Sequence, residues 1–122
     1  MTLLPFDDRD GTIWFDGQLT PWRDAKLHIL SHGLHYASAV FEGERVYDGR
    51  IFKSSEHSAR LVRSAELMDF KIPYSAEEID RFKNETVAAN SIVDGYVRPI
   101  AWRGSEMMGV SAQHNKIHLA IA

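Results

Sequence analysis

The residues best suited to chemistry lie in three separate stretches of the sequence. They are 31–45 (SHGLHYASAVFEGER), 57–61 (HSARL) and 96–99 (YVRP). Their histidine, tyrosine, arginine and glutamate side chains can bind anions, donate hydrogen bonds or carry protons. No Gly-rich phosphate loop, nucleophile elbow or paired-carboxylate motif accompanies them, so the sequence does not indicate NTP, ester or glycoside chemistry.

The third stretch opens a predicted strand over residues 96–103, in which alternation places Tyr96, Arg98, Ile100 and Trp102 on one face. Two aromatic rings and a guanidinium make a poor core face and a good ligand face. A buried arginine without an anionic partner is strongly destabilising. We therefore expect Arg98 to meet Glu42, Glu44, or the carboxylate or phosphate of a ligand.

Two further groups of side chains have both a structural and a functional interpretation. Arg60 is either a solvated helix arginine or, beside His57, a fixed donor for a carboxylate or phosphate. The aromatic residues are either core residues or pocket walls, and the tyrosine hydroxyls then need polar partners. These aromatic residues are Tyr36, Phe41, Tyr96 and Trp102.

A metal site is disfavoured. His28, His32 and His35 have the i, i+4, i+7 spacing of one helix face, but Ser31 and Gly33 weaken a helix there. No carboxylate lies within the cluster to complete an open site, and the chain has no cysteine. We predict no metal.

Composition bounds the class of protein. The 122 residues suffice for one domain with a real core, and the net charge of -3 comes without any lysine or arginine cluster. Nucleic-acid and membrane-surface roles are therefore disfavoured. The absence of cysteine suits a cytoplasmic protein, no apolar run approaches the roughly 20 residues of a membrane span, and residues 1–9 lack the features of a signal peptide.

The turn and strand signals predict several hairpins. Asp16-Gly17 and Asp48-Gly49 are two-residue hairpin turns. They join predicted strands 12–15 to 18–20 and 38–47 to 50–53, and further strands are expected over 96–103 and 116–122. A helix start is possible at 24–26, with at most one short helical piece before Tyr36.

Two longer helices are predicted between these hairpins. The first runs from Ser54 or Ser55 to about residue 70, with Leu61, Ala65 and Met68 as its inward stripe. The second begins with a capping box at 75–78 and runs to about residue 90, with Ile79, Phe82, Val87 and Thr86 inward. The predicted fold is a single α+β domain over 1–122, a two-layer sandwich of antiparallel sheet and two helices. Because the sequence stops inside an apolar strand, we expect it to be part of a longer chain.

The motifs His35-Tyr36-x4-Phe41-Glu-Gly43, His57-x-x-Arg60-Leu61 and Tyr96-x-Arg98-Pro99, followed by Met108-Gly-Val110, closely resemble the N-terminal half of branched-chain amino acid aminotransferases. These are fold-type IV enzymes that use pyridoxal 5'-phosphate. The resemblance implies that Arg60 holds the cofactor phosphate, with His57 in support, and that Phe41, Tyr96 and Arg98 line the substrate pocket. It further implies that Tyr36 and Val110 reach the active site of the neighbouring subunit in a homodimer or higher homo-oligomer.

The resemblance also implies what this chain lacks. In this family the catalytic lysine lies in a C-terminal domain, and none of the five lysines matches it (Lys26, Lys53, Lys71, Lys83 and Lys116). We therefore assign no catalytic residue and expect the chain alone to be inactive. The parent enzyme would transfer the amino group of leucine, isoleucine or valine to 2-oxoglutarate. The alternatives are a D-amino acid or (R)-amine transaminase, an aminodeoxychorismate lyase, or a stand-alone non-catalytic assembly domain.

Overall fold

The structure is a computed structural model that describes residues 3–122. Its strands are β1 (Thr12–Phe15), β2 (Gln18–Pro21), β3 (Ala39–Phe41), β4 (Glu44–Tyr47), β5 (Arg50–Ile51), β6 (Gly95–Val97), β7 (Pro99–Arg103) and β8 (Ile117–Ile121). Its helices are the short 3₁₀ helix η1 (Trp22–Asp24), the short α1 (His32–Tyr36), and the longer α2 (Ser54–Leu67) and α3 (Ala76–Ala89).

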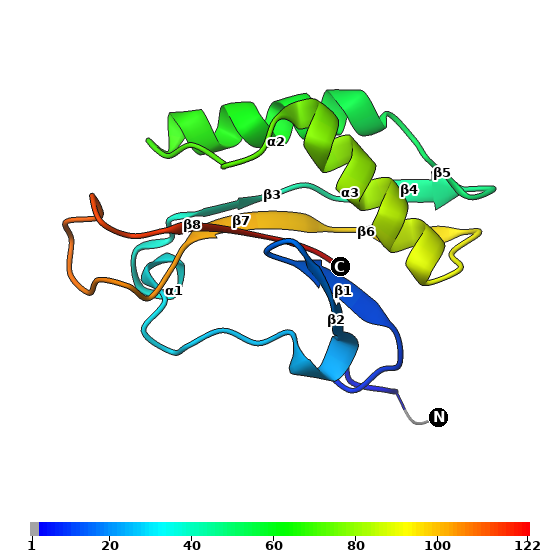
Figure 1. Cartoon of the computed structure of the whole chain (residues 1–122), viewed down its shortest axis with the longest axis horizontal. Coiled ribbons are helices and arrows are strands. Elements are labelled where there is room, and N and C mark those ends of the chain that lie inside the picture. The colour runs from blue at the N-terminus through cyan, green and yellow to red at the C-terminus, as the bar shows by residue number, and fades with distance from the viewer. Residues whose placement is uncertain (1–2) are drawn as a thin grey trace.

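The strands form two antiparallel sheets. The larger has the order β2-β1-β8-β7-β3 and the smaller the order β5-β4-β6. Helices α2 and α3 lie together over one face of this β layer, and η1 and α1 lie on its other side (Figure 1). The predicted two-layer α+β architecture is therefore confirmed. The hairpin turns at 16–17 and 48–49 are confirmed as well, with Asp16 and Asp48 at positive φ as such turns require.

The two long strands predicted over 38–47 and 96–103 are each divided between the two sheets, the first passing from the larger to the smaller and the second from the smaller to the larger. β3 pairs with β7, while β4 pairs with β6. The division falls where Glu42 donates its N–H to the Pro99 carbonyl. Pro99 has no N–H to return and Gly43 weakens a strand, so the regular ladder is interrupted at this point. This interruption creates the bend on which the candidate site is built.

The main core lies between the helices and the sheets. Leu61 and Ala65 of α2 face inward and are fully buried, as predicted, but Met68 is 40% exposed. Phe70 is buried in its place. α2 ends at Leu67, and a positive φ at Asp69 turns the chain so that Phe70 N–H bonds back to the Ala65 carbonyl. The predicted continuation of the stripe to Met68 is thus wrong because the helix ends before that residue.

Helix α3 follows its sequence signals closely. The predicted capping box is present, with Ser75 Oγ accepting from Glu78 N and Glu78 Oε1 accepting from Ser75 N. Ile79, Thr86 and Val87 are buried, and Phe82 is partly buried with its ring stacked on Trp14. No helix starts at 24–26, where the chain forms the short η1 directly after Pro21. The one short helical piece expected before Tyr36 is confirmed as α1.

A second, smaller cluster lies on the opposite face of the larger sheet. Ile13, Trp102 and Ala120 form it, and side chains of the 22–25 segment pack beside them. In the part of the chain that the structure describes, no helix is both long and apolar enough to cross a membrane.

Candidate active site

Glu42 is the centre of the first half of the candidate site. Its side chain is 5% exposed and accepts two hydrogen bonds from Arg60, at 2.8 Å from Nε and 2.7 Å from Nη2. His57 Nδ1 lies 2.6 Å from the same carboxylate. Because Arg60 and His57 are three residues apart on α2, they reach one carboxylate from one side of the helix. The structure supports the second interpretation of Arg60, in which it is a fixed donor to a carboxylate.

Hydrogen bonds from Arg60 and His57 favour the charged form of Glu42. Burial alone would raise the pKa of Glu42, but hydrogen bonds from Arg60 and His57 outweigh burial and hold this pKa below its ordinary value. The carboxylate therefore remains charged at neutral pH. A charged, two-pronged acceptor fixes the plane of the Arg60 guanidinium.

The outer side of Arg60 is open. Its side chain is 67% exposed, and Nη1 has no hydrogen-bond partner among residues 3–122. A guanidinium that is held on one edge and open on the other is ready to bind an anion such as a phosphate. The arrangement therefore fits the cofactor phosphate that the sequence motifs imply at this position.

The second half of the site lies on the other face of the same backbone. Because side chains alternate along a strand, Phe41 points away from the helices while Glu42 points toward α2. The Arg98 guanidinium lies 4.6 Å from the centre of the Phe41 ring. Arg98 also donates to the Tyr96 hydroxyl, at 3.0 Å from Nη2. The three predicted pocket residues Phe41, Tyr96 and Arg98 are thus together.

The expectation that Arg98 is buried is wrong. Of its expected anionic partners, Glu42 and Glu44 bind other cations, and a ligand carboxylate or phosphate stays a prediction. Arg98 is exposed, and its polar contact is the Tyr96 hydroxyl. Glu42 is bound by α2, and Glu44 is fully buried against Lys83, with 2.6 Å between Glu44 Oε1 and Lys83 Nζ. Alternation explains the difference, since even-numbered residues of 42–46 face the helices whereas Arg98 faces away.

Gly43 makes room for Tyr96. A Cβ at residue 43 would overlap the Tyr96 hydroxyl. The ring therefore lies directly against the backbone at the bend between β3 and β4. This close approach explains why a residue without a side chain stands at this position.

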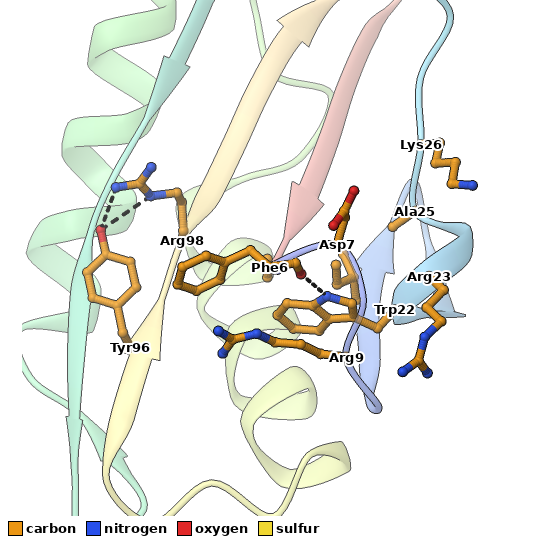
Figure 2. A pocket seen from close by; sticks show the side chains of 11 residues that line it. Phe6, Asp7, Arg9, Trp22, Arg23, Ala25, Lys26, Tyr96 and Arg98 are labelled. Carbon is orange, nitrogen blue, oxygen red and sulfur yellow. Dashed lines mark hydrogen bonds between the residues drawn. The ribbon is translucent and has the colours of Figure 1, made fainter. Parts of the chain in front are cut away.

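A broad cavity of about 960 Å³ opens beside Tyr96 and Arg98. Figure 2 shows these two side chains on one wall and Phe6, Arg9 and Trp22 from the N-terminal part of the chain opposite them. Phe6 is fixed there because its carbonyl accepts from the Trp22 indole N–H. Aromatic rings interleaved with guanidinium groups suit a ligand that has an apolar part and a carboxylate.

Tyr36 and Val110 lie elsewhere. Tyr36 closes α1, where its ring packs against His32, and Val110 is 81% exposed on the loop between β7 and β8. The His32 N–H donates to the Gly104 carbonyl at the start of that loop, so the two elements are adjacent. No hydrogen bond or aromatic contact of the described residues joins Tyr36 to the Phe41–Tyr96–Arg98 group. Within one chain, these two predicted site residues are not brought to the other three.

The three histidines near α1 serve the local backbone. His28 Nδ1 accepts from the Leu30 N–H, His35 Nε2 bonds the Ile29 carbonyl, and buried His32 bonds Ser38 Oγ. Among residues 3–122 there is no group of three potential metal ligands placed to share an ion.

Sequence reasoning missed two sets of polar residues. One is Glu42 as the partner of Arg60, although strand alternation places Glu42 on the same face as Val40 and Val46. The other is Lys83, which falls on the inward stripe between Ile79 and Val87 and is fully buried. An inward lysine predicts a buried carboxylate, and Glu44 fills that role.

The family model for class IV aminotransferases matches residues 39–122, which span both halves of the candidate site. The chain belongs to the class IV aminotransferases. Among similar relatives of this class IV chain, a probable branched-chain-amino-acid aminotransferase of Rickettsia conorii is 40% identical over 122 residues. The branched-chain-amino-acid aminotransferase of Pseudomonas aeruginosa is 46% identical over 119 residues, 94% of this chain. The chain spans 42% and 39% of the lengths of these two relatives.

Solved structures of the family agree with the fold of this class IV chain. The T.th. branched-chain amino acid aminotransferase complexed with 4-methylvaleric acid superposes with a TM-score of 0.88 at 36% identity. The same enzyme complexed with N-(5'-phosphopyridoxyl)-L-glutamate gives 0.87 at 36% identity. Each comparison covers 93% of this chain and 40% of the T.th. chain. The resemblance predicted from the motifs is thereby confirmed.

Proposed function

We propose that the protein is the N-terminal part of a pyridoxal-phosphate-dependent aminotransferase. The reaction moves the amino group of leucine, isoleucine or valine to 2-oxoglutarate. The observation that carries the proposal is the pair of guanidinium groups on the two faces of one bend. Arg60 lies on the helix side, and Arg98 lies among aromatic rings on the pocket side.

Arg60 binds the phosphate of the cofactor in this proposal. Its orientation is fixed by Glu42, and its open edge accepts the phosphate. When bound, the cofactor supplies a ring that withdraws electrons from the α-carbon of the amino acid. The pyridoxyl adduct of glutamate in the T.th. enzyme supports the same cofactor and amino acid class here.

The catalytic lysine comes from the part of the enzyme outside this chain. Lys83 is unsuited to the role because Glu44 and the Ser54 carbonyl bind its amino group in the core. The other lysines are exposed (Lys26, Lys53, Lys71 and Lys116). We therefore expect the isolated chain to bind the cofactor weakly and not to transaminate.

Phe41, Tyr96 and Arg98 bind the substrate. The two rings form an apolar wall for an aliphatic side chain, and Arg98 orients a carboxylate. The 4-methylvaleric acid complex of the T.th. enzyme supports a branched aliphatic substrate. Tyr36 and Val110 are both exposed on a single chain. They complete the pocket of a neighbouring subunit in a homodimer, a state to be measured by sedimentation of the whole enzyme.

The test uses the whole enzyme with added pyridoxal 5'-phosphate. The bound cofactor should give an absorbance band near the visible range. L-leucine should bleach this band. Arg60→Gln should raise the Kd for the cofactor about tenfold or more. Arg63→Gln, an exposed arginine of the same helix, should leave it unchanged.

Two results would refute the proposal. Bleaching by D-alanine alone would favour a D-amino acid transaminase, and no cofactor band would favour the non-catalytic assembly domain. Intact mass of the natural gene product separates the latter independently, since a mass near 13.9 kDa would leave no room for a second domain.

A further inference from the structure

His118 lies between two carboxylates at the end of the molecule that carries Val110. Its Nδ1 is 2.6 Å from Asp16 Oδ2, and its Nε2 is 2.9 Å from Glu106 Oε2. Asp16 belongs to the β1–β2 turn, and Glu106 belongs to the loop of residues 104–116 between β7 and β8. One imidazole ring therefore joins two segments that are far apart in the sequence.

This geometry requires both ring protons. A neutral imidazole has one N–H and one lone pair, so it can donate to only one of the two carboxylates. The imidazolium donates to both. We propose that His118 in its imidazolium form is a positioning residue that fastens the 104–116 loop, and with it Val110, to the β1–β2 turn.

The two anchors are unequal, so the loop is the side that is released. Asp16 is held independently, because its N–H donates to the Leu119 carbonyl and its Oδ1 accepts from the Leu119 N–H. Glu106 has one other bond, from the Lys116 N–H inside the same loop. When the ring loses one proton, one nitrogen keeps its N–H and the other carries a lone pair. With the N–H kept on the Asp16 side, the lone pair of Nε2 faces the Glu106 carboxylate and the bond to Glu106 is lost. The 104–116 loop then loses its attachment to the β1–β2 turn.

The surroundings of the ring favour its charge. Burial alone would lower the pKa of His118, but the hydrogen bonds to Asp16 and Glu106 outweigh burial and raise this pKa above its ordinary value. The Trp102 ring stacks on the imidazole from β7. Two other titratable side chains, Lys26 and His28 of the 22–31 segment, line the same small cavity. Of these titratable groups, the two carboxylates are the ones that hydrogen-bond the ring.

The sign of the pH dependence follows from the raised pKa. The stabilisation of the loop is fully present below the ordinary histidine pKa and is lost as the pH rises through the folded-state value. At the acid end the stabilisation persists until Glu106 protonates. Burial alone would raise the pKa of Glu106, but hydrogen bonds from His118 and from backbone N–H groups outweigh burial and hold this pKa below its ordinary value. The loop is therefore most ordered in mildly acidic and neutral solution and loosens in mildly alkaline solution.

Hydrogen exchange of the backbone amides in 104–116 tests this inference. Protection factors, corrected for intrinsic exchange, should fall about tenfold from about pH 6 to about pH 9 in the native chain. In His118→Gln they should be low at both pH values. His114→Gln removes an exposed histidine of the same loop and should behave like the native chain. Flat protection in the native chain, or an unchanged fall in His118→Gln, would overturn the inference.

A second variant separates geometry from charge. A Cβ on Gly104 would overlap His118 Nε2 and Glu106 Oε1, both of which are ends of side chains that can move. Gly104→Ala should therefore push the two groups apart while keeping both. Its loop protection should be low, and the His118 pKa, followed by imidazole NMR, should fall toward the ordinary value. An unshifted His118 pKa in Gly104→Ala would contradict the double hydrogen bond.

The consequence for substrate binding rests on the proposed function, whereas the exchange experiment uses no substrate. A transaminating enzyme with flat loop protection would overturn this inference and leave the proposed function intact. Loop protection that follows His118 in a protein without transaminase activity would refute the proposed function alone.

Discussion

At the scale of single residues, Glu42 is decisive because it is buried and charged and binds the one arginine assigned to the cofactor. Glu42→Gln keeps the size of the side chain and removes its charge. We expect the free energy of unfolding to fall by about 1–2 kcal/mol, the lower end of the cost of a broken charged hydrogen bond, since Arg60 is mostly exposed. Urea unfolding measures this loss. Glu66→Gln, which changes an exposed glutamate on α2, is the matched control.

Glu42→Gln should also affect the cofactor. Without the carboxylate, the guanidinium of Arg60 is free to rotate, and the Kd for pyridoxal 5'-phosphate in the whole enzyme should rise about fivefold. An unchanged Kd together with reduced stability would mean that Glu42 is structural only.

Gly43 offers a test confined to the other face of the bend. In Gly43→Ala the new methyl group displaces the Tyr96 ring and breaks the bond between Tyr96 and Arg98. The KM for leucine should rise roughly tenfold in steady-state kinetics, while the Kd for the cofactor stays unchanged because Arg60 is on the opposite face. Equal losses in substrate and cofactor binding would show that the two faces are not independent.

At the scale of elements, the sequence predicts a helix or strand boundary well when the residues that determine this boundary are close together in the sequence. The hairpin turns and the Ser75 capping box are determined within about four residues, and the sequence patterns identified them. The division at Gly43 and the early end of α2 depend on partners distant in the sequence, such as Pro99 and the packing of Phe70. A local pattern does not contain that information.

The candidate site follows the same rule. The motifs predict Arg60, Phe41 and Arg98 as site residues, but the grouping of Phe41 with Arg98 follows from the pairing of β3 with β7. That pairing brings Phe41 and Arg98 together across residues separated by two helices. The polar partners could not be assigned in advance, because Glu42 and Glu44 were both plausible acceptors and alternation alone does not say which cation each one meets.

Lys83 holds three elements together. Its amino group on α3 bonds Glu44 of β4 and the Ser54 carbonyl at the start of α2. Lys83→Met should lower the free energy of unfolding by about 3–5 kcal/mol, because Glu44 is left charged in the core. The double variant Lys83→Met with Glu44→Leu should regain most of this stability, since apolar replacement of a whole buried pair is close to neutral. Urea unfolding of both proteins tests this, and a double variant no more stable than the single one would contradict it.

At the scale of the whole molecule, the paired groups set two limits to the pH range of stability. Hydrogen bonds and nearby cations outweigh burial and hold the pKa of several carboxyls below the ordinary value, so their stabilisation is present above the unfolded-state pKa and is lost as the pH falls through the folded one. His118 has the opposite sign and loses its contribution as the pH rises. Burial raises the pKa of Glu44, which opposes the acid loss in part. The carboxyls with lowered pKa are Glu42, Glu78, Asp80 and Glu106.

We therefore expect the midpoint of urea unfolding to be highest between about pH 5 and pH 7 and to fall on both sides. Single substitutions should distinguish the fall of the midpoint on the acid side from the fall on the alkaline side. His118→Gln should remove the fall on the alkaline side and reduce the acid side only by the part that Glu106 contributes, since the bond to His118 lowers the Glu106 pKa. Glu42→Gln should reduce the acid side and keep the alkaline one. A midpoint that rises on acidification would mean that the buried Glu44 outweighs the four paired carboxyls. An alkaline fall that survives in His118→Gln would assign it to a group other than the ring between Asp16 and Glu106.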